Sequence, residues 1–285
     1  MKKFLSSLLA LSLLVMLSCT NRNPLNSGSV NSASDTLALI SKIDSYKKMG
    51  YPMTDYHAHL KGGLTIEGLM DHSAKTGISY GVAVNCGLGF PVSNDSAMME
   101  NFRFLQPHPV YKALQAEGRE WRTLVSPDSV KMYDYVFTDA MTFTDDKGRR
   151  MRLWINEEVW VDDKQVFMET LVERIVGIME NEPVDIYVNP TFLPEVISKQ
   201  YDELWTEKRM DRVIAAAVKN NIAIEINCRY KIPSAAFIKK AKESGVKFTM
   251  GTNNVDANIG YLEYGMEMIE ECDLEPSDFW QGKKL

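Results

Sequence analysis

Two histidines two residues apart, His57 and His59, are the clearest candidates for chemistry in a chain that contains four histidines. They follow Asp55 in a short stretch whose composition is compatible with a β-strand. Because side chains at i and i+2 of a strand point to the same face, we expect Asp55, His57 and His59 to share one face. Two imidazoles beside a carboxylate suit a divalent metal ion. A solvated pair on an edge strand is the alternative.

Carboxylates in later stretches are the other candidates for the same site. Glu225 alternates with isoleucines in a predicted strand, so it occupies the face opposite to them. We predict that Glu225 is a third metal ligand; the alternative is a buried structural carboxylate. Asp139 ends another predicted strand, and Asp55 and Asp139 are assigned as catalytic residues that complete the metal shell or orient an imidazole.

Asparagines and one arginine near the predicted strand ends are expected to bind the substrate. Asparagine side chains donate and accept hydrogen bonds but cannot act as bases. The arginine could bind an anion with two parallel hydrogen bonds, with a surface salt bridge as the alternative. The predicted substrate-binding residues are Asn85, Asn189, Asn227, Arg229 and Asn253.

The elements that must position these residues alternate between strand and helix. Seven strands are expected, at residues 53–59, 80–85, 121–125, 134–139, 184–189, 222–227 and 246–250. Helices are expected at 36–48, 65–77, 96–117 with a break near 107–109, 162–181, 193–202, 206–220, 233–244 and 256–271. This alternation argues for a parallel sheet. The polar or small second face of the strands favours a seven-stranded (β/α) TIM-like barrel over an open sheet, with its site at the C-terminal strand ends.

An insertion interrupts the alternation between residues 142 and 154. Its centre reads Asp145-Asp146-Lys147-Gly148, which predicts a β-hairpin. We expect this hairpin to cover one end of the barrel. With Phe143, Trp154 and Trp160 nearby, a docking surface of an envelope scaffold protein is the alternative.

The N-terminus has the pattern of an export signal. Lys2 and Lys3 precede an apolar run from Phe4 to Leu17, which is too short to span a bilayer, and Cys19 follows it. This resembles a bacterial lipoprotein signal, so we expect residues 1–18 to be a signal peptide and Cys19 to be lipidated. Residues 19–34 are rich in Asn and Ser and predict a flexible tether, and residues 35–285 a single barrel domain. An ordinary cleaved signal is the alternative.

The net charge and the cysteine content limit which partners and which cellular location are expected. The chain carries a net charge of −6, which argues against nucleic-acid binding and leaves the lipid as the only predicted contact with a membrane. We therefore expect an exported protein anchored in the bacterial cell envelope, in the outer membrane. Cys86, Cys228 and Cys272 are widely spaced and give no disulfide framework.

Three stretches resemble the polymerase and histidinol phosphatase (PHP) superfamily. They are Asp55-Tyr56-His57-Ala58-His59-Leu60, the strand Ala223-Ile224-Glu225-Ile226-Asn227, and the run from Lys239 to Asn254. The resemblance implies a metal-dependent phosphoesterase on a distorted seven-stranded α/β barrel, acting on a small molecule such as a phosphate ester. It implies a divalent metal cofactor, Zn, Mn or Fe.

Several positions depart from the pattern of that superfamily. The last strand ends Gly251-Thr252-Asn253-Asn254-Val255 where the superfamily has Gly-Ser-Asp-Ala-His, and Asn189-Pro190 stands where it has His-Pro. Ligands are thus replaced by neutral side chains, which implies a reduced site with one or at most two ions. A barrel that has lost catalysis and binds a ligand or partner is therefore the alternative function.

A second resemblance covers only the opening motif. The stretch from His57 to Thr65 is similar to the start of adenosine-deaminase-type amidohydrolases, in which a strand also leads into a glycine-rich turn and a helix. An amidohydrolase is therefore a further alternative.

Overall fold

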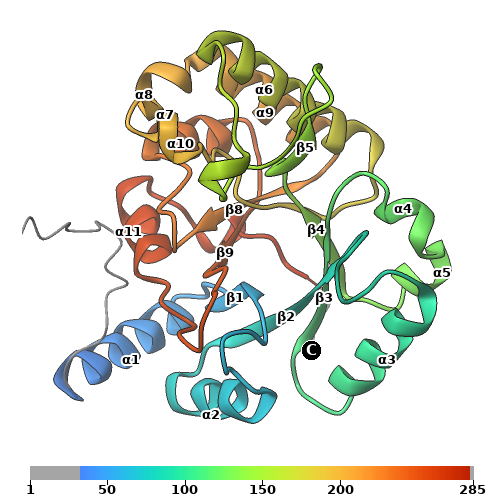
Figure 1. Ribbon diagram of the computed structural model, residues 1–285. Helices are drawn as coiled ribbons and strands as arrows, with labels where there is room; N and C mark the ends of the chain where they lie inside the picture. Colours follow the sequence, from blue (N-terminus) through green and yellow to red (C-terminus); the bar gives the residue numbers. More distant parts are fainter. Residues whose placement is uncertain (1–32, 283–285) are drawn as a thin grey trace, which may run out of the picture.

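A closed barrel of seven parallel strands forms the centre of the protein (Figure 1). This computed structural model describes residues 33–282, so the predicted signal peptide, Cys19 and most of the tether lie outside the described residues. The barrel order is β1-β2-β3-β4-β7-β8-β9. The strands are β1 (Thr54–Ala58), β2 (Ser79–Cys86), β3 (Tyr111–Ala116), β4 (Tyr135–Thr138), β7 (Ile186–Tyr187), β8 (Ala223–Asn227) and β9 (Phe248–Gly251). The predicted seven-stranded TIM-like barrel is confirmed.

Helices surround the barrel on its outside (Figure 1). They are α1 (Ala33–Lys48), α2 (Ile66–Thr76), α3 (Asp95–Leu105), α4 (Trp121–Leu124), α5 (Pro127–Val130), α6 (Lys164–Asn181), α7 (Glu195–Ser198), α8 (Tyr201–Leu204), α9 (Glu207–Lys219), α10 (Ala235–Glu243) and α11 (Glu263–Glu271), with 3₁₀ turns at Asn156–Glu158 and Pro276–Asp278. Side-chain caps fix several starts; the Thr65 hydroxyl, for example, accepts a hydrogen bond from the Gly68 backbone N–H at the start of α2.

The third strand of the barrel is not where the sequence predicted it. The predicted helix over 96–117 ends early, β3 follows it, and the predicted strand at 121–125 is the short helix α4. The run Lys112-Ala113-Leu114-Gln115-Ala116 consists of good helix formers, which explains the error. Pairing with β2 on one side and β4 on the other outweighs that local preference.

The remaining predicted strands and most predicted helices are present with shifted ends. The helix expected at 193–202 is split into α7 and α8, and the last helix begins at Glu263 instead of residue 256. The predicted hairpin is confirmed as two antiparallel strands, β5 (Thr142–Thr144) and β6 (Arg150–Arg152), which leave the barrel between β4 and α6.

Aromatic side chains fill the barrel interior toward the N-terminal ends of the strands. Tyr56 packs edge-on against Tyr135 and Trp280, with ring centroids 5.7 Å and 5.5 Å away. The Tyr135 hydroxyl donates a 2.6 Å hydrogen bond to the Tyr56 carbonyl. Gly81 lies under the Tyr135 ring, where any larger side chain would overlap the hydroxyl. These aromatic side chains fill the N-terminal end of the barrel. A functional site is therefore expected at the other end, where the strands have their C-termini.

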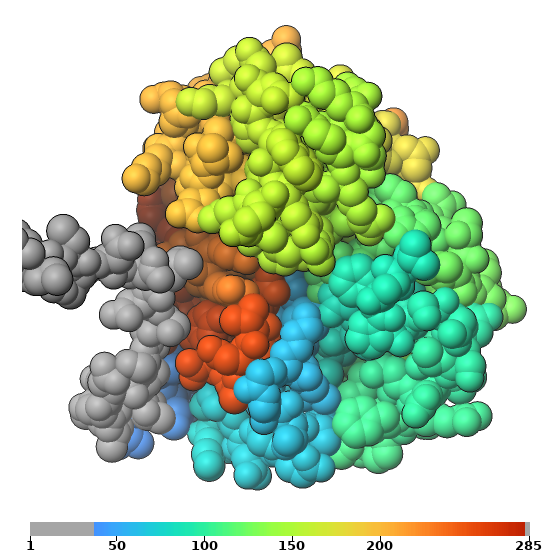
Figure 2. Space-filling model, in the orientation of Figure 1, coloured from blue at the N-terminus to red at the C-terminus, as the bar shows by residue number. Residues whose placement is uncertain are grey.

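The segments that follow the first and the last strand meet over the open end. Gly62, in the turn after β1, lies directly against Asp256 in the segment after β9. Figure 2 shows these segments, in blue and orange-red, side by side below the hairpin region in yellow-green. No helix within residues 33–282 is both long and apolar enough to cross a membrane.

Candidate active site at the C-terminal end of the barrel

An irregularity in β1 decides which side chains enter the site. The pairing of β1 with β2 shifts register between Asp55 and Ala58. As a result, two consecutive residues face the same inner side of β4: the Tyr56 ring lies 5.7 Å from that of Tyr135, and the His57 ring lies 4.5 Å from that of Phe137. The expectation of one shared face holds for His57 and His59, whose ring centroids lie 5.2 Å apart, and is wrong for Asp55, because a bulge adds one residue to the repeat.

Asp55 connects β1 to the end of β9 instead of facing the histidines. Its Oδ1 accepts hydrogen bonds from the backbone N–H groups of His57, at 3.1 Å, and Thr252, at 3.0 Å. Its Oδ2 accepts one from the Thr252 hydroxyl at 2.5 Å. The side chain is fully buried, and burial raises its pKa. These contacts give Asp55 a structural place, and none of them is made to an imidazole ring.

Glu225 contacts the Nδ1 atom of the His57 ring. Glu225 Oε1 lies 2.6 Å from His57 Nδ1, and both side chains are buried. Glu225 Oε2 accepts hydrogen bonds from the Asn189 backbone N–H, at 2.9 Å, and from Asn227 Nδ2, at 3.0 Å. The structure brings Glu225 to His57 as expected, but on the Nδ1 side. A carboxylate in that position orients a ligating histidine, whereas we had predicted Glu225 as a direct ligand.

His59 is fixed by backbone groups. Its Nδ1 lies 3.0 Å from the Ala83 carbonyl, and its backbone N–H donates to Asn254 Oδ1 at 2.7 Å. Burial lowers the pKa of His59 well below its usual value, and the neighbouring His57 and Lys61 lower it further. The ring is therefore neutral, which is the form that binds metal ions.

The Nε2 atoms of His57 and His59 are both buried, and neither has a hydrogen-bond partner, although the side chain of Gln115 stands beside the His59 ring. The two ring centroids are 5.2 Å apart. Leaving such an atom unpaired costs about 1–3 kcal/mol, so two neighbouring unpaired nitrogens indicate a ligand. With both Nδ1 atoms engaged, the pair fits a metal ion bound through Nε2.

The protein groups around this pair form only part of a metal shell. Within residues 33–282, no three side chains of the types His, Cys, Asp and Glu are placed to hold one metal ion together. The remaining coordination positions of an ion on His57 and His59 would therefore fall to water or substrate, or to a carboxylate that moves. This agrees with the donor set of an open site more than with that of a closed structural site.

Glu117, one residue beyond β3, is a functional candidate that the sequence analysis missed. It is buried, and its Oε1 accepts a 2.7 Å hydrogen bond from Asn85 Nδ2, which also donates to Gln115 Oε1 at 3.0 Å. Burial, and then the nearby charge of Asp139, raise the pKa of Glu117 to about 8. The alternation of Ala113, Gln115 and Glu117 after a proline-rich break was the signal that could have revealed it.

Asp139 is in the site, as expected. Its Oδ1 accepts a hydrogen bond from the Met141 backbone N–H, and its Oδ2 accepts one from Asn189 Nδ2, both at 2.8 Å. Burial raises its pKa, while these hydrogen bonds and His57 act in the opposite direction. The negative charge of Asp139 raises the pKa of Glu117. The two residues form a pair of buried carboxyl groups at the same end of the barrel.

Three of the predicted asparagines are joined in one network. Asn189 Oδ1 accepts hydrogen bonds from Asn227 Nδ2, at 2.8 Å, and Asn253 Nδ2, at 3.2 Å. Asn189 and Asn253 have φ values of +49° and +44°, a left-handed conformation that asparagine tolerates better than most residues. The backbone at these two strand ends is therefore compatible with asparagine.

Three basic side chains belong to the same region. Arg229 donates to the Asn253 carbonyl at 3.1 Å and lies 5.0 Å over the Tyr230 ring. Arg119 donates to Glu182 at 2.6 Å and to the Thr138 hydroxyl at 3.0 Å. The positive charges of Arg119 and of the exposed Lys61 lower the pKa of Glu117, against the larger effect of burial. These cations offset the buried carboxylates and suit an anionic ligand.

Comparison with known proteins supports the fold. No family model matches the chain, and no curated protein matches it either. Among solved structures it is similar to histidinol phosphate phosphatase from Lactococcus lactis subsp. lactis, in complex with zinc, L-histidinol and phosphate. The TM-score is 0.57 at 13% identity, covering 79% of this chain and 95% of that one. The chain therefore has the barrel fold of that phosphatase, and the likeness extends to the fold alone.

Proposed function

We propose that this protein is a metal-dependent hydrolase that acts on small phosphate esters, with a reduced metal site held by His57 and His59. The observation that carries the proposal is the pair of buried Nε2 atoms without partners. A divalent ion bound there, Zn, Mn or Fe, would supply a Lewis acid and lower the pKa of a bound water.

The chain's own groups have separate tasks in this proposal. Glu225 and the Ala83 carbonyl fix the two rings through their Nδ1 atoms. Glu117, with its raised pKa, carries a proton near neutral pH and is suited to deliver it to a leaving oxygen. Asp139 holds Asn189 in place, so that the amide network can position the substrate.

The substrate class follows from charge. Lys61, Arg119 and Arg229 lie around the site, and a guanidinium can hold a phosphate with two hydrogen bonds. The structural neighbour was solved with phosphate and L-histidinol, which is a parallel at the level of the fold. We propose a phosphate ester on these two grounds.

A barrel that binds a ligand without catalysis is the second candidate. The amides of Asn189, Asn227 and Asn253 are bonded mainly to each other and to carboxylates, and an amide can hold a ligand by hydrogen bonds but cannot act as a base. This candidate predicts ligand binding that does not require a metal.

Metal analysis separates the two candidates. The chain from residue 19 onward, with Cys19→Ser, would be loaded with Zn, Mn or Fe, dialysed, and assayed for bound metal and for hydrolysis of p-nitrophenyl phosphate. We expect about one ion per chain, lost in His57→Ala and His59→Ala and kept in the matched control His108→Ala. Equal metal content in all four folded proteins, or none in any, would overturn the hydrolase proposal.

We further propose that Cys19 is lipidated and anchors the barrel in the bacterial cell envelope. The support is the basic and apolar N-terminal pattern that ends at this cysteine.

A further inference from the structure

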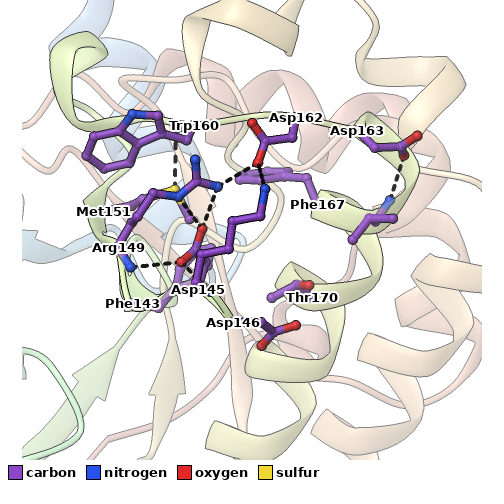
Figure 3. Close-up of a pocket in the computed structure, with 12 residues that line it drawn as sticks. Phe143, Asp145, Asp146, Arg149, Met151, Trp160, Asp162, Asp163, Phe167 and Thr170 are labelled. Carbon is purple, nitrogen blue, oxygen red and sulfur yellow. Dashed lines mark hydrogen bonds and ion pairs between the residues drawn. The ribbon is translucent and has the colours of Figure 1, made fainter.

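A hollow lies between the β5–β6 hairpin and the start of α6 (Figure 3). Its volume is about 300 Å³, at the lower end of the range for pockets that bind small molecules. None of its lining residues belongs to the candidate active site. It is therefore a separate feature with its own chemistry.

The inner wall of the hollow is apolar. Phe143 from β5, Met151 from β6 and Phe167 from α6 are buried beneath it, and the Phe143 and Phe167 rings lie 6.2 Å apart. Trp160 and Val166 line it while 39% and 62% exposed. Covering exposed apolar surface of this kind is favourable, at about 25 cal/mol per Å².

Ion pairs join the charged side chains of the rim. Arg149 lies 5.4 Å from the centre of the Trp160 ring and donates 2.8 Å hydrogen bonds to Asp145 and Asp162. Lys147 donates to Asp162 at 2.7 Å. Figure 3 shows Arg149, Asp145, Asp162 and Trp160 grouped on one side of the hollow.

The charge of the rim selects the ligand. The two basic side chains that line the hollow are paired with Asp145 and Asp162, which leaves Asp146 and Asp163 without a basic partner among the lining residues. Asp163 also caps α6 through the backbone N–H groups of Gln165 and Val166. The excess of negative charge attracts cations and repels anions.

We infer that this hollow is a second binding site, for a small organic cation that carries an aromatic or alkyl group. The apolar part would cover Phe167, Val166 and Trp160, and the ammonium group would lie at the acidic rim, which carries Asp146 and Asp163 on different sides of the hollow (Figure 3). The site neither uses nor requires the metal at His57 and His59.

Three probes of matched shape test this inference on the chain from residue 19 onward. They are phenethylammonium, its neutral analogue phenethyl alcohol and the anion 3-phenylpropionate, each titrated by NMR. For ligands of this size we expect a Kd for phenethylammonium on the order of 1 mM. The alcohol should bind roughly 5-fold more weakly, and the anion should not saturate.

Substitutions locate the binding. The double variant Asp146→Asn/Asp163→Asn removes the charge while asparagine keeps the helix cap, so phenethylammonium should bind no better than the alcohol. Val166→Ala should weaken both. Val196→Ala, at another exposed valine outside the hollow, is the control and should change neither. Equal affinity for all three probes, or unchanged affinity in the hollow variants, would refute the inference.

Discussion

His57 Nδ1 and Glu225 Oε1 lie 2.6 Å apart in a region closed to solvent, with the two residues on strands that are not neighbours in the barrel order. The short contact fixes which imidazole nitrogen is engaged and which is left for a ligand. In the proposed site, the carboxylate therefore leaves Nε2 as the atom of His57 that would bind a metal ion.

The first prediction concerns this contact. Glu225→Ala should weaken zinc binding by about 10–100-fold, as is typical when the group that orients a ligating histidine is lost. Glu225→Gln should weaken it less, because an amide oxygen still accepts from Nδ1–H. Competition with a chromophoric chelator measures both. Glu207→Gln, on the exposed side of α9, is the control, and equal affinity in Glu225→Ala would show that the contact does not support the metal.

Glu117 should make folding stability depend on pH. Its pKa rises from 4.5 to about 8 on folding, so the folded state binds the extra proton between these values. The free energy of unfolding should therefore fall as the pH rises from about 4.5 to 8, by at most about 1.4 kcal/mol per pH unit for this group, and level off above. Urea unfolding at a series of pH values, in the presence of chelator, measures the slope.

Glu117→Gln should remove this part of the slope and leave the protein more stable than the parent near pH 8. Hydrolysis by the same variant should decline, since glutamine cannot transfer the proton. The exposed Glu195→Gln should keep the parental slope. A parental slope in Glu117→Gln would mean that this carboxyl group is not protonated in the folded protein.

Asp55 should matter for stability and little for metal content. Asp55→Ala leaves the Thr252 hydroxyl and two buried backbone N–H groups without their acceptor, so we expect a loss of about 2–4 kcal/mol in the free energy of unfolding. Thr252→Val should cost less, and the double variant should cost less than the sum. Loss of metal from a variant of unchanged stability would instead place Asp55 in the site.

The proposed lipidation of Cys19 can be tested in cells. Cys19→Ser should move the protein from the membrane fraction to the soluble fraction of the envelope and prevent labelling with a fatty-acid analogue. Cys86→Ser, at a buried cysteine of the barrel, should stay with the membranes. Membrane association that persists in Cys19→Ser would rule out this anchor.

The barrel could be predicted from the sequence because its signal is repeated along the chain. In strands such as β8, isoleucines that pack outward alternate with Glu225 and Asn227, and this pattern survives the folding of the chain. In β3 the alternation was masked, since Ala, Leu, Gln and Lys favour a helix when read locally. Misplacing β3 hid Glu117, because the residue was assigned to the end of a helix instead of the end of a strand.

The contents of the site were harder to predict than its place. His57, Glu225, Asn189 and Asp139 are joined in that order by direct hydrogen bonds, near where the strand ends were expected to converge. The face of Asp55 was predicted wrongly because a single extra residue in β1 reverses the face of everything before it. Such a bulge depends on pairing with β2 and with β9, and β9 lies far away in sequence.

Hydrogen bonds between the ends of β1 and β9 affect when the site can form during synthesis on the ribosome. Both histidines emerge early, but the Asn253 N–H donates to the His57 carbonyl at 2.8 Å, and Asn254 bonds both the N–H and the carbonyl of His59. A nascent chain therefore carries His57 and His59 unassembled until the last strand, β9, has been translated. Premature termination before residue 254 would yield a product with both imidazoles and no geometry to use them.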